Sequence, residues 1–159
     1  MDVERFKISV YRRLSPAWRQ RATRWATPNF SVGVMVMLID AQGRLLLVRP
    51  TYREGWLPPG GFLASGESAE QAGRRELREE LGVDVPVDPP HRVFLDIERR
   101  GVTFVVCARL PEGQVPRLAG PELERWRWFD LEEIPPSPAD FHEGIWEQDL
   151  DAVRRVGQG

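Results

Sequence analysis

The sequence has few of the residues that define several common protein classes. Among its 159 residues Cys107 is the single cysteine, which excludes an intramolecular disulfide and a thiolate zinc site. One cysteine fits a reducing compartment, and we expect it to fill space in the core. No apolar run approaches the roughly 20 residues that a membrane helix needs, and charges interrupt residues 1–13, where a secretory signal would be apolar. We therefore expect a cytoplasmic protein with no membrane span.

Lysine is also scarce, because Lys7 is the one lysine among 22 basic residues. The net charge of −2 conceals an uneven distribution: residues 1–25 carry seven basic and two acidic side chains. This basic arm is a candidate for binding nucleic acid or another anionic surface. The alternative is a pair of helices that packs on the rest of the chain, or across a homodimer, with its arginines in solvent.

Apolar periodicity predicts a mixed α/β domain at residues 29–159, preceded by an N-terminal helical extension at residues 1–28. A capping box formed by Ser68 and Gln71, with Gly82 as the terminator, marks one helix clearly. Residues between the second strand and this helix form a loop rich in proline and glycine. The strands are expected at 30–40, 44–50, 91–98, 102–109 and 124–129, and the helices of the domain at 69–81 and 139–155.

Three glutamates share one face of the predicted helix over 69–81. Glu76, Glu79 and Glu80 stand at positions i, i+3 and i+4, so their carboxylates project within a single turn. Such like charges repel by about a few tenths of a kcal/mol per pair, and Arg75 and Arg78 offset part of this. Carboxylates without histidine or cysteine are also the ligands that Mg²⁺ or Mn²⁺ prefers. Viewed alone, however, such a run is more typical of an ordinary charged helix face.

The surroundings of this run favour the metal site. The segment 61–83 resembles the Nudix box, G-x5-E-x7-R-E-U-x-E-E-x-G-U, where U is a bulky aliphatic residue. The nine positions that match are Gly61, Glu67, Arg75, Glu76, Leu77, Glu79, Glu80, Gly82 and Val83. The similarity extends over about residues 30–135, from the Trp56–Gly61 approach to the closing Trp128–Pro135 segment. In place of a further glutamate that many members carry, this sequence has Ala64.

The Nudix resemblance implies a fold and a reaction. The fold is an α/β/α sandwich with a mixed β-sheet, and the reaction is hydrolysis of a phosphoric anhydride bond in a nucleoside diphosphate linked to a moiety X, such as a nucleotide sugar, ADP-ribose or a (d)NTP. The implied cofactor is Mg²⁺ or Mn²⁺. By analogy the metal ligands are the Gly60 carbonyl and Glu76, Glu79 and Glu80. Arg75 is expected to orient a helix glutamate or only to neutralise charge, and Glu67 to brace the loop against the helix.

The general base is left open among several acids. By analogy with the Nudix family, the base is either a glutamate of the Nudix box, here Glu79, or an acid from a later loop. Glu122 lies six residues before Trp128 and matches in spacing the late glutamate of MutT-type members. Asp96 and Glu98, from the neighbouring hairpin, are rivals.

Substrate contacts are expected near the glycine-rich loop. Arg49 and Arg53 are candidates for phosphate contacts, and Trp56 for stacking on a base. Packing of Trp56 within the loop is the alternative. Two other functions remain open: an RNA-end or nucleic-acid-associated hydrolase that uses the basic arm, and a nucleotide-sensing module without catalysis. The retained box glutamates disfavour the sensing module.

Overall fold

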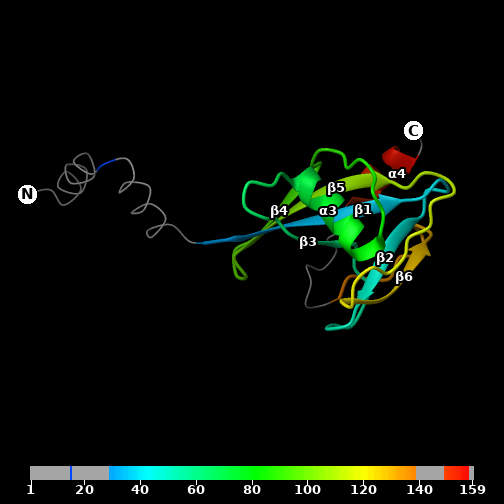
Figure 1. Ribbon diagram of the computed structural model, residues 1–159, viewed down its shortest axis with the longest axis horizontal. Coiled ribbons are helices and arrows are strands. Elements are labelled where there is room, and N and C mark those ends of the chain that lie inside the picture. The colour runs from blue at the N-terminus through cyan, green and yellow to red at the C-terminus, as the bar shows by residue number, and fades with distance from the viewer. Residues whose placement is uncertain (1–14, 16–28, 139–148, 158–159) are drawn as a thin grey trace, which may run out of the picture.

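The structure is a computed structural model that describes Ser15, residues 29–138 and residues 149–157 (Figure 1). A six-stranded sheet forms its centre, in the order β4-β5-β1-β2-β6, and β3 pairs with β1 outside that path. The strands are β1 Ser31–Ile39, β2 Leu45–Pro50, β3 Gly60–Phe62, β4 Arg92–Asp96, β5 Gly101–Arg109 and β6 Leu123–Phe129. Because β1 and β5 run parallel while the other pairs are antiparallel, the predicted mixed sheet is confirmed.

The five strands predicted from the sequence are all present, and each begins and ends within two residues of its expected limits. β1 and β2 occupy central positions, as their continuous apolar runs indicated. Ile39 pairs with Leu45, so the two strands form the expected hairpin. Asp40 stabilises its turn by accepting hydrogen bonds from the backbone N–H groups of Gln42 and Arg44.

β3 is the element that sequence reasoning missed, since residues 51–66 were expected to be entirely loop. Its pairing with β1 sets Phe62 beside Gly33 and Gly61 beside Val34. A strand of three residues, two of them glycine, has neither an alternating nor a continuous apolar pattern. It cannot be predicted from its own sequence and is recognised only from its pairing with β1. At Gly60, a Cβ atom would collide with the Val34 carbonyl oxygen, and this close approach requires glycine.

The helix α3, Ala69–Leu81, matches its predicted limits. Ser68 Oγ accepts from Gln71 N, while Gln71 Oε1 accepts from Ser68 N at 2.9 Å, which confirms the capping box. Gly82 adopts the left-handed conformation, with φ 63°, and ends the helix. The apolar stripe of α3 faces one side of the sheet and leaves the acidic face directed toward β3.

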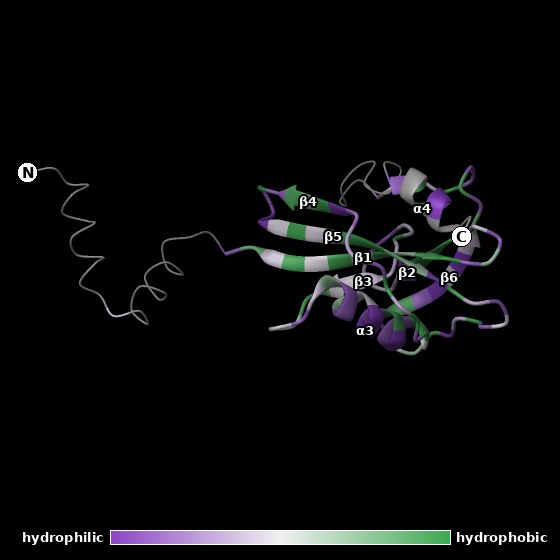
Figure 2. Ribbon diagram, turned by 90° about the horizontal axis from the view of Figure 1, so that it is seen from above, coloured by the Kyte–Doolittle hydropathy of each residue, from purple (hydrophilic) through white to green (hydrophobic). Residues whose placement is uncertain are grey.

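Two helices cover opposite faces of the sheet, α3 on one side and α4, Leu150–Gly157, on the other (Figure 2). The α/β/α architecture is therefore confirmed. α4 lies in the C-terminal part of the helix predicted at 139–155, and Val153 is fully buried as its apolar position required. Asp149 is also buried, and its Oδ1 lies 3.0 Å from Nε2 of His91, the residue immediately before β4.

The predicted helical extension at 1–28 lies outside the described residues apart from Ser15, and so does residue range 139–148. Cys107 is buried against the α4 side of the sheet, as expected for a core position. Within the described parts of the chain, no helix has the length and apolar character needed to cross a membrane.

Candidate active site

The three glutamates of α3 lie beside β3. Glu76 is mostly buried, with 12% of its side chain exposed, and its carboxylate lies against the Cα of Gly61, where any side chain would displace it. Glu80 Oε2 accepts a hydrogen bond of 3.3 Å from the backbone N–H of Gly60. Glu79 is 59% exposed at the edge of the group. The helical spacing and the two glycines together bring the glutamates and the loop backbone into one place.

A fourth carboxylate, Glu122, joins this group from a distant part of the sequence. It lines a hollow of about 230 Å³ whose other lining residues are Glu76, Glu79, Glu80, Gly120, Pro121 and Leu123. The segment that carries Glu122 is fastened to the end of α3, because Arg117 N donates to Leu81 O at 2.8 Å and Ala119 N to Glu80 O at 3.1 Å. Its other side is tied to the loop after β2, where Thr51 N donates to the Glu122 carbonyl.

Burial and mutual repulsion oppose ionisation inside this hollow. Burial, together with the nearby charges of Glu76 and Glu122, raises the pKa of Glu80 to about 8. Burial likewise raises the pKa of Glu76, although its hydrogen bond with Arg75 acts in the opposite direction. A cation placed among these carboxylates would favour their charged forms.

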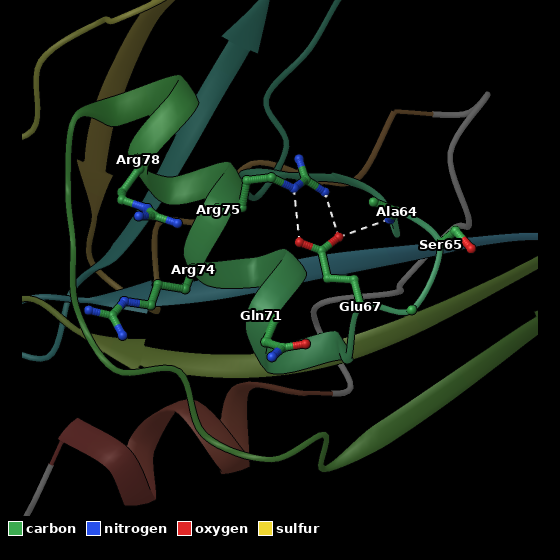
Figure 3. A pocket seen from close by; sticks show the side chains of 8 residues that line it. Ala64, Ser65, Glu67, Gln71, Arg74, Arg75 and Arg78 are labelled. Carbon is green, nitrogen blue, oxygen red and sulfur yellow. Dashed lines mark hydrogen bonds and ion pairs between the residues drawn. The ribbon is translucent and has the colours of Figure 1, made fainter.

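Arg75 is the cation that the chain itself supplies, and all five of its N–H groups are used. Nε and Nη2 donate to the two oxygens of Glu67 at 3.0 Å each, as Figure 3 shows. Nη2 also donates to Phe62 O at 2.8 Å, and Nη1 donates to Glu76 at 2.7 Å and to Glu79 at 3.1 Å. Arg75 thus joins the loop before α3 to two of the glutamates.

The donor set of this hollow fits a hard divalent cation. All of its side-chain donors are carboxylate oxygens, the ligands that Mg²⁺ and Mn²⁺ prefer. In the described part of the chain no three acidic, histidine or cysteine side chains already stand at metal-ligand geometry. The ion pairs of Arg75 explain this, because they hold Glu76 and Glu79 toward the guanidinium.

Comparison with known proteins identifies the family. The family model for the NUDIX domain matches residues 29–150 of this chain. The chain belongs to the Nudix family. The sequence resemblance is thereby confirmed, and with it the assignment to hydrolases that act on acid anhydrides.

Individual Nudix relatives differ in their named activities. A MutT-like protein of Streptomyces ambofaciens is 32% identical over 77% of this chain and 77% of its own length. An RNA pyrophosphohydrolase of Gluconacetobacter diazotrophicus is 31% identical over 79% of this chain and 92% of that protein. Among solved structures, the MutT NUDIX hydrolase of Burkholderia pseudomallei superposes with a TM-score of 0.58 at 26% identity, covering 82% of this chain and 98% of that one.

Glu67 and the candidates for the general base lie in different parts of the structure. Glu67 accepts a further hydrogen bond of 2.8 Å from Ala64 N, so the residue that replaces a glutamate of the family pattern lies at the loop turn (Figure 3). Asp96 accepts from Arg99 N within the turn after β4. Glu98 is exposed in the same turn. Of the acids considered for the base, Glu79 and Glu122 line the carboxylate hollow, whereas Asp96 and Glu98 are not among its described lining residues.

The three candidate substrate-binding residues lie in different environments. Arg49 is paired with Glu124 on β6, with 3.3 Å between Nε and Oε2. Trp56 packs edge-on against Phe129, with ring centroids 5.2 Å apart, which favours the packing alternative for this ring. Arg53 lines a second hollow of about 340 Å³ on the far side of β3. Two aromatic residues that were not selected from the sequence, Tyr52 and Phe62, also line that hollow. Neither belongs to a periodic apolar pattern, and this was the one sequence signal that they are not core residues.

Proposed function

We propose that this Nudix protein hydrolyses a phosphoric anhydride bond in a nucleoside diphosphate linked to a moiety X, with Mg²⁺ or Mn²⁺ as cofactor. The observation that carries the proposal is the convergence of Glu122 with Glu76, Glu79 and Glu80 on one hollow beside the glycine strand. Burial among other carboxylates opposes the ionisation of Glu80. Keeping all four carboxylates charged therefore requires more positive charge than Arg75 provides.

Glu76, Glu79, Glu80 and the Gly60 carbonyl would hold the cation. When bound, it would supply charge to the anhydride oxygens and acidity to a coordinated water. The chain contributes the rest. Glu122, or Glu79 in its place, accepts the proton of the attacking water as its oxygen forms a bond to phosphorus. The bridging P–O bond then breaks, and its electron pair leaves with the departing phosphate.

Arg75 and Glu67 act on position in this scheme. The guanidinium fixes the carboxylates of Glu76 and Glu79 and ties the Phe62 carbonyl to the same group. Since the loop and α3 are joined at this point, Glu67 keeps Gly60 and Gly61 beside the glutamates. Correct placement of this kind accounts for a large share of rate enhancement in phosphoryl transfer.

A hydrolysis screen tests the proposal. The intact protein with Mg²⁺ is offered dNTPs, oxidised dGTP, ADP-ribose, nucleotide sugars, dinucleoside polyphosphates and CDP-alcohols, and product release is followed by chromatography. We expect one class to be cleaved, and Glu80→Gln to lower its turnover by orders of magnitude. Glu70→Gln, a change on the same helix away from the hollow, is the matched control. Absence of cleavage across the whole panel, or equal turnover in both variants, would reject the proposal.

A second candidate is removal of pyrophosphate from an RNA 5′ end. The relative named RNA pyrophosphohydrolase and the basic residues of the 1–25 arm favour it. A 5′-triphosphorylated RNA belongs in the same panel, because its end contains the same anhydride. If RNA is the substrate, deletion of residues 1–25 should weaken its binding and reduce the salt dependence of that binding.

A further inference from the structure

We infer that the basic arm docks on the edge strand β4 of its own chain, with Trp18 and Trp25 as its contact residues. The sequence allows two roles for this arm, binding of an anionic surface or packing on the rest of the chain. The structure describes a surface that fits the second role. That surface is separate from the carboxylate hollow, so the docking goes beyond the proposed function.

A row of large apolar side chains is exposed along β4. Val93 is 53% exposed, Leu95 is 60% exposed, and Ile97, in the turn directly after the strand, is 73% exposed. β4 forms one edge of the sheet, where it pairs with β5 alone among the described strands (Figure 2). Natural sheets protect such an edge with charged side chains or cover it with a helix or loop. An uncovered apolar row on an edge strand therefore indicates an interaction surface.

Strand register extends this row across the sheet. Leu95 pairs with Val102 on β5, and Val102 pairs with Val32 on β1, so their side chains share one face of three adjacent strands. α3 packs on the same face farther along the strands, over Val36 and Val106. Val32 and Val102 remain partly exposed. The apolar face thus continues past α3 with no helix over it in the described part of the chain.

The basic arm carries a matching apolar side. Trp18, Ala22 and Trp25 stand at positions i, i+4 and i+7, which is the spacing of one face of a helix. Ser15–Pro16 before them is a typical helix start, and the residue before Pro28 disfavours continuation of the helix. A short helix with two tryptophans on one side is marginal in water by itself, and it gains stability when that side is buried.

The chain enters the sheet next to the exposed row. Ser31, the first residue of β1, pairs with Gly101, and its N–H donates to Arg100 O at 2.9 Å. Gly101 in turn pairs with Asp96, the last residue of β4. Two strand spacings, about 10 Å, therefore separate the start of β1 from β4. The residues between Trp25 and Ser31 span up to about 20 Å when extended, so Trp25 can reach the row.

The arm fits this surface better than a second copy of the chain does. Stable interfaces between separate proteins take about 20–30 residues from each side, far more than this row supplies. Attachment at β1 holds the arm beside the row at an effective concentration of about 1 mM, so a small contact area is sufficient. Arg19, Arg21 and Arg24 occupy other positions around the helix and stay in solvent in this arrangement.

Trypsin tests the docking, because the arm contains several cleavage sites. Cleavage after Arg19, Arg21 and Arg24 in the intact protein is timed by mass spectrometry and compared with cleavage of a synthetic peptide of residues 1–28. We expect the protein to be cleaved at least about tenfold more slowly, since the docked segment must open first. Leu95→Lys should raise the rate in the protein several-fold, because a charged group opposes burial of the row.

Further variants distinguish loss of docking from loss of the fold. Leu95→Thr keeps a residue that favours strands and should raise the rate in the same direction. Trp25→Ala should also raise the rate, and combining it with Leu95→Lys should add little, because both changes break one contact. Val115→Lys is the matched control, since Val115 is 66% exposed in the segment between β5 and β6. It should leave the rate unchanged.

Light scattering on the same samples identifies the occupant of the row. We expect the unaltered protein and Leu95→Lys to have the same mass. Cleavage of the arm as fast as that of the peptide, or no increase in either Leu95 variant, overturns the docking. A dimer that Leu95→Lys converts to a monomer also overturns it, because a second copy would then cover the row. The assay needs no substrate, so its outcome is independent of the proposed function.

Discussion

Arg75 donates two hydrogen bonds to Glu67, one to each carboxylate oxygen, and both measure 3.0 Å. This pair closes the loop that begins at β3 onto the helix that carries the glutamates. The hydrogen bonds from Arg75 hold the pKa of Glu67 below its usual range, so the carboxylate remains charged at neutral pH. A planar fork is needed for such two-point contact, and lysine cannot supply it.

Arg75→Lys should therefore disturb the site more than the fold. We expect kcat/KM to fall about 10- to 100-fold, as is usual when a residue that orients metal ligands is lost. Arg74→Lys is a close control, because Arg74 forms a comparable two-point pair with Asp84 on the exposed side of α3. Kinetics and thermal unfolding are measured for both. An equal loss of activity in the two variants would contradict the positioning role.

Gly61 should tolerate no side chain. In Gly61→Ala the new methyl carbon would lie 2.6 Å from Cδ of Glu76, so the carboxylate must move. We expect weaker Mn²⁺ binding, measured by calorimetry or paramagnetic resonance, and lower turnover. Gly101→Ala provides the comparison, since its nearest heavy atom would be the Asp96 Cβ at 3.8 Å. If both variants bind Mn²⁺ equally well, the contact between Gly61 and Glu76 has no bearing on the metal site.

Glu122→Gln tests the general base. If Glu122 accepts the proton of the attacking water, kcat should fall about 10²- to 10⁴-fold while the Mg²⁺ concentration needed for half-maximal rate stays nearly constant. Glu124→Gln, two residues farther along on β6, should have little effect, because Glu124 pairs with Arg125 and Arg49 instead. A normal kcat in Glu122→Gln would transfer the role to Glu79. A raised Mg²⁺ requirement would identify Glu122 as a metal ligand.

Removal of divalent metal should make stability depend on pH through Glu80. The folded pKa of about 8 exceeds the ordinary value of 4.5, so between these limits the folded state retains a proton that the unfolded chain has lost. The free energy of unfolding should therefore fall as pH rises through this window, and the contribution is complete only below pH 4.5. Urea unfolding in chelator at pH 5.5, 7 and 8.5 measures this slope.

Glu80→Gln should flatten that slope, because the amide does not titrate. Mg²⁺ should restore stability most at the alkaline end, where binding no longer has to displace a proton. The same slope in Glu80→Gln and in the unaltered protein would show that another group is responsible.

Cys107 should be unreactive in the folded protein. It is 3% exposed, and burial raises the pKa of its thiol to about 12, so thiolate is scarce at neutral pH. Ellman's reagent at pH 8 should label one thiol per chain in guanidinium chloride and almost none under native conditions. Rapid labelling of the native protein would contradict the burial of Cys107 on the α4 side of the sheet.

Local sequence determined much of this protein. Ser68, Gln71 and Gly82 defined α3 because caps act on neighbouring backbone groups, and helical periodicity alone put Glu76, Glu79 and Glu80 on one face. The apolar runs of β1 and β2 predicted central strands, and the nine matched positions of the Nudix box identified the family before any contact was known.

Tertiary structure decided the features that depend on chain segments far apart in sequence. Pairing with β1 turned three residues with no strand pattern into β3, and fastening of the 117–122 segment to the end of α3 brought Glu122 to the other glutamates. Register across β5, β1 and β3 opened the hollow that Phe62 borders, while Trp56 packed against Phe129. Helical spacing is a property of neighbouring residues and can be read from order alone, whereas strand partners and loop contacts are chosen by the burial and hydrogen bonding of the whole chain.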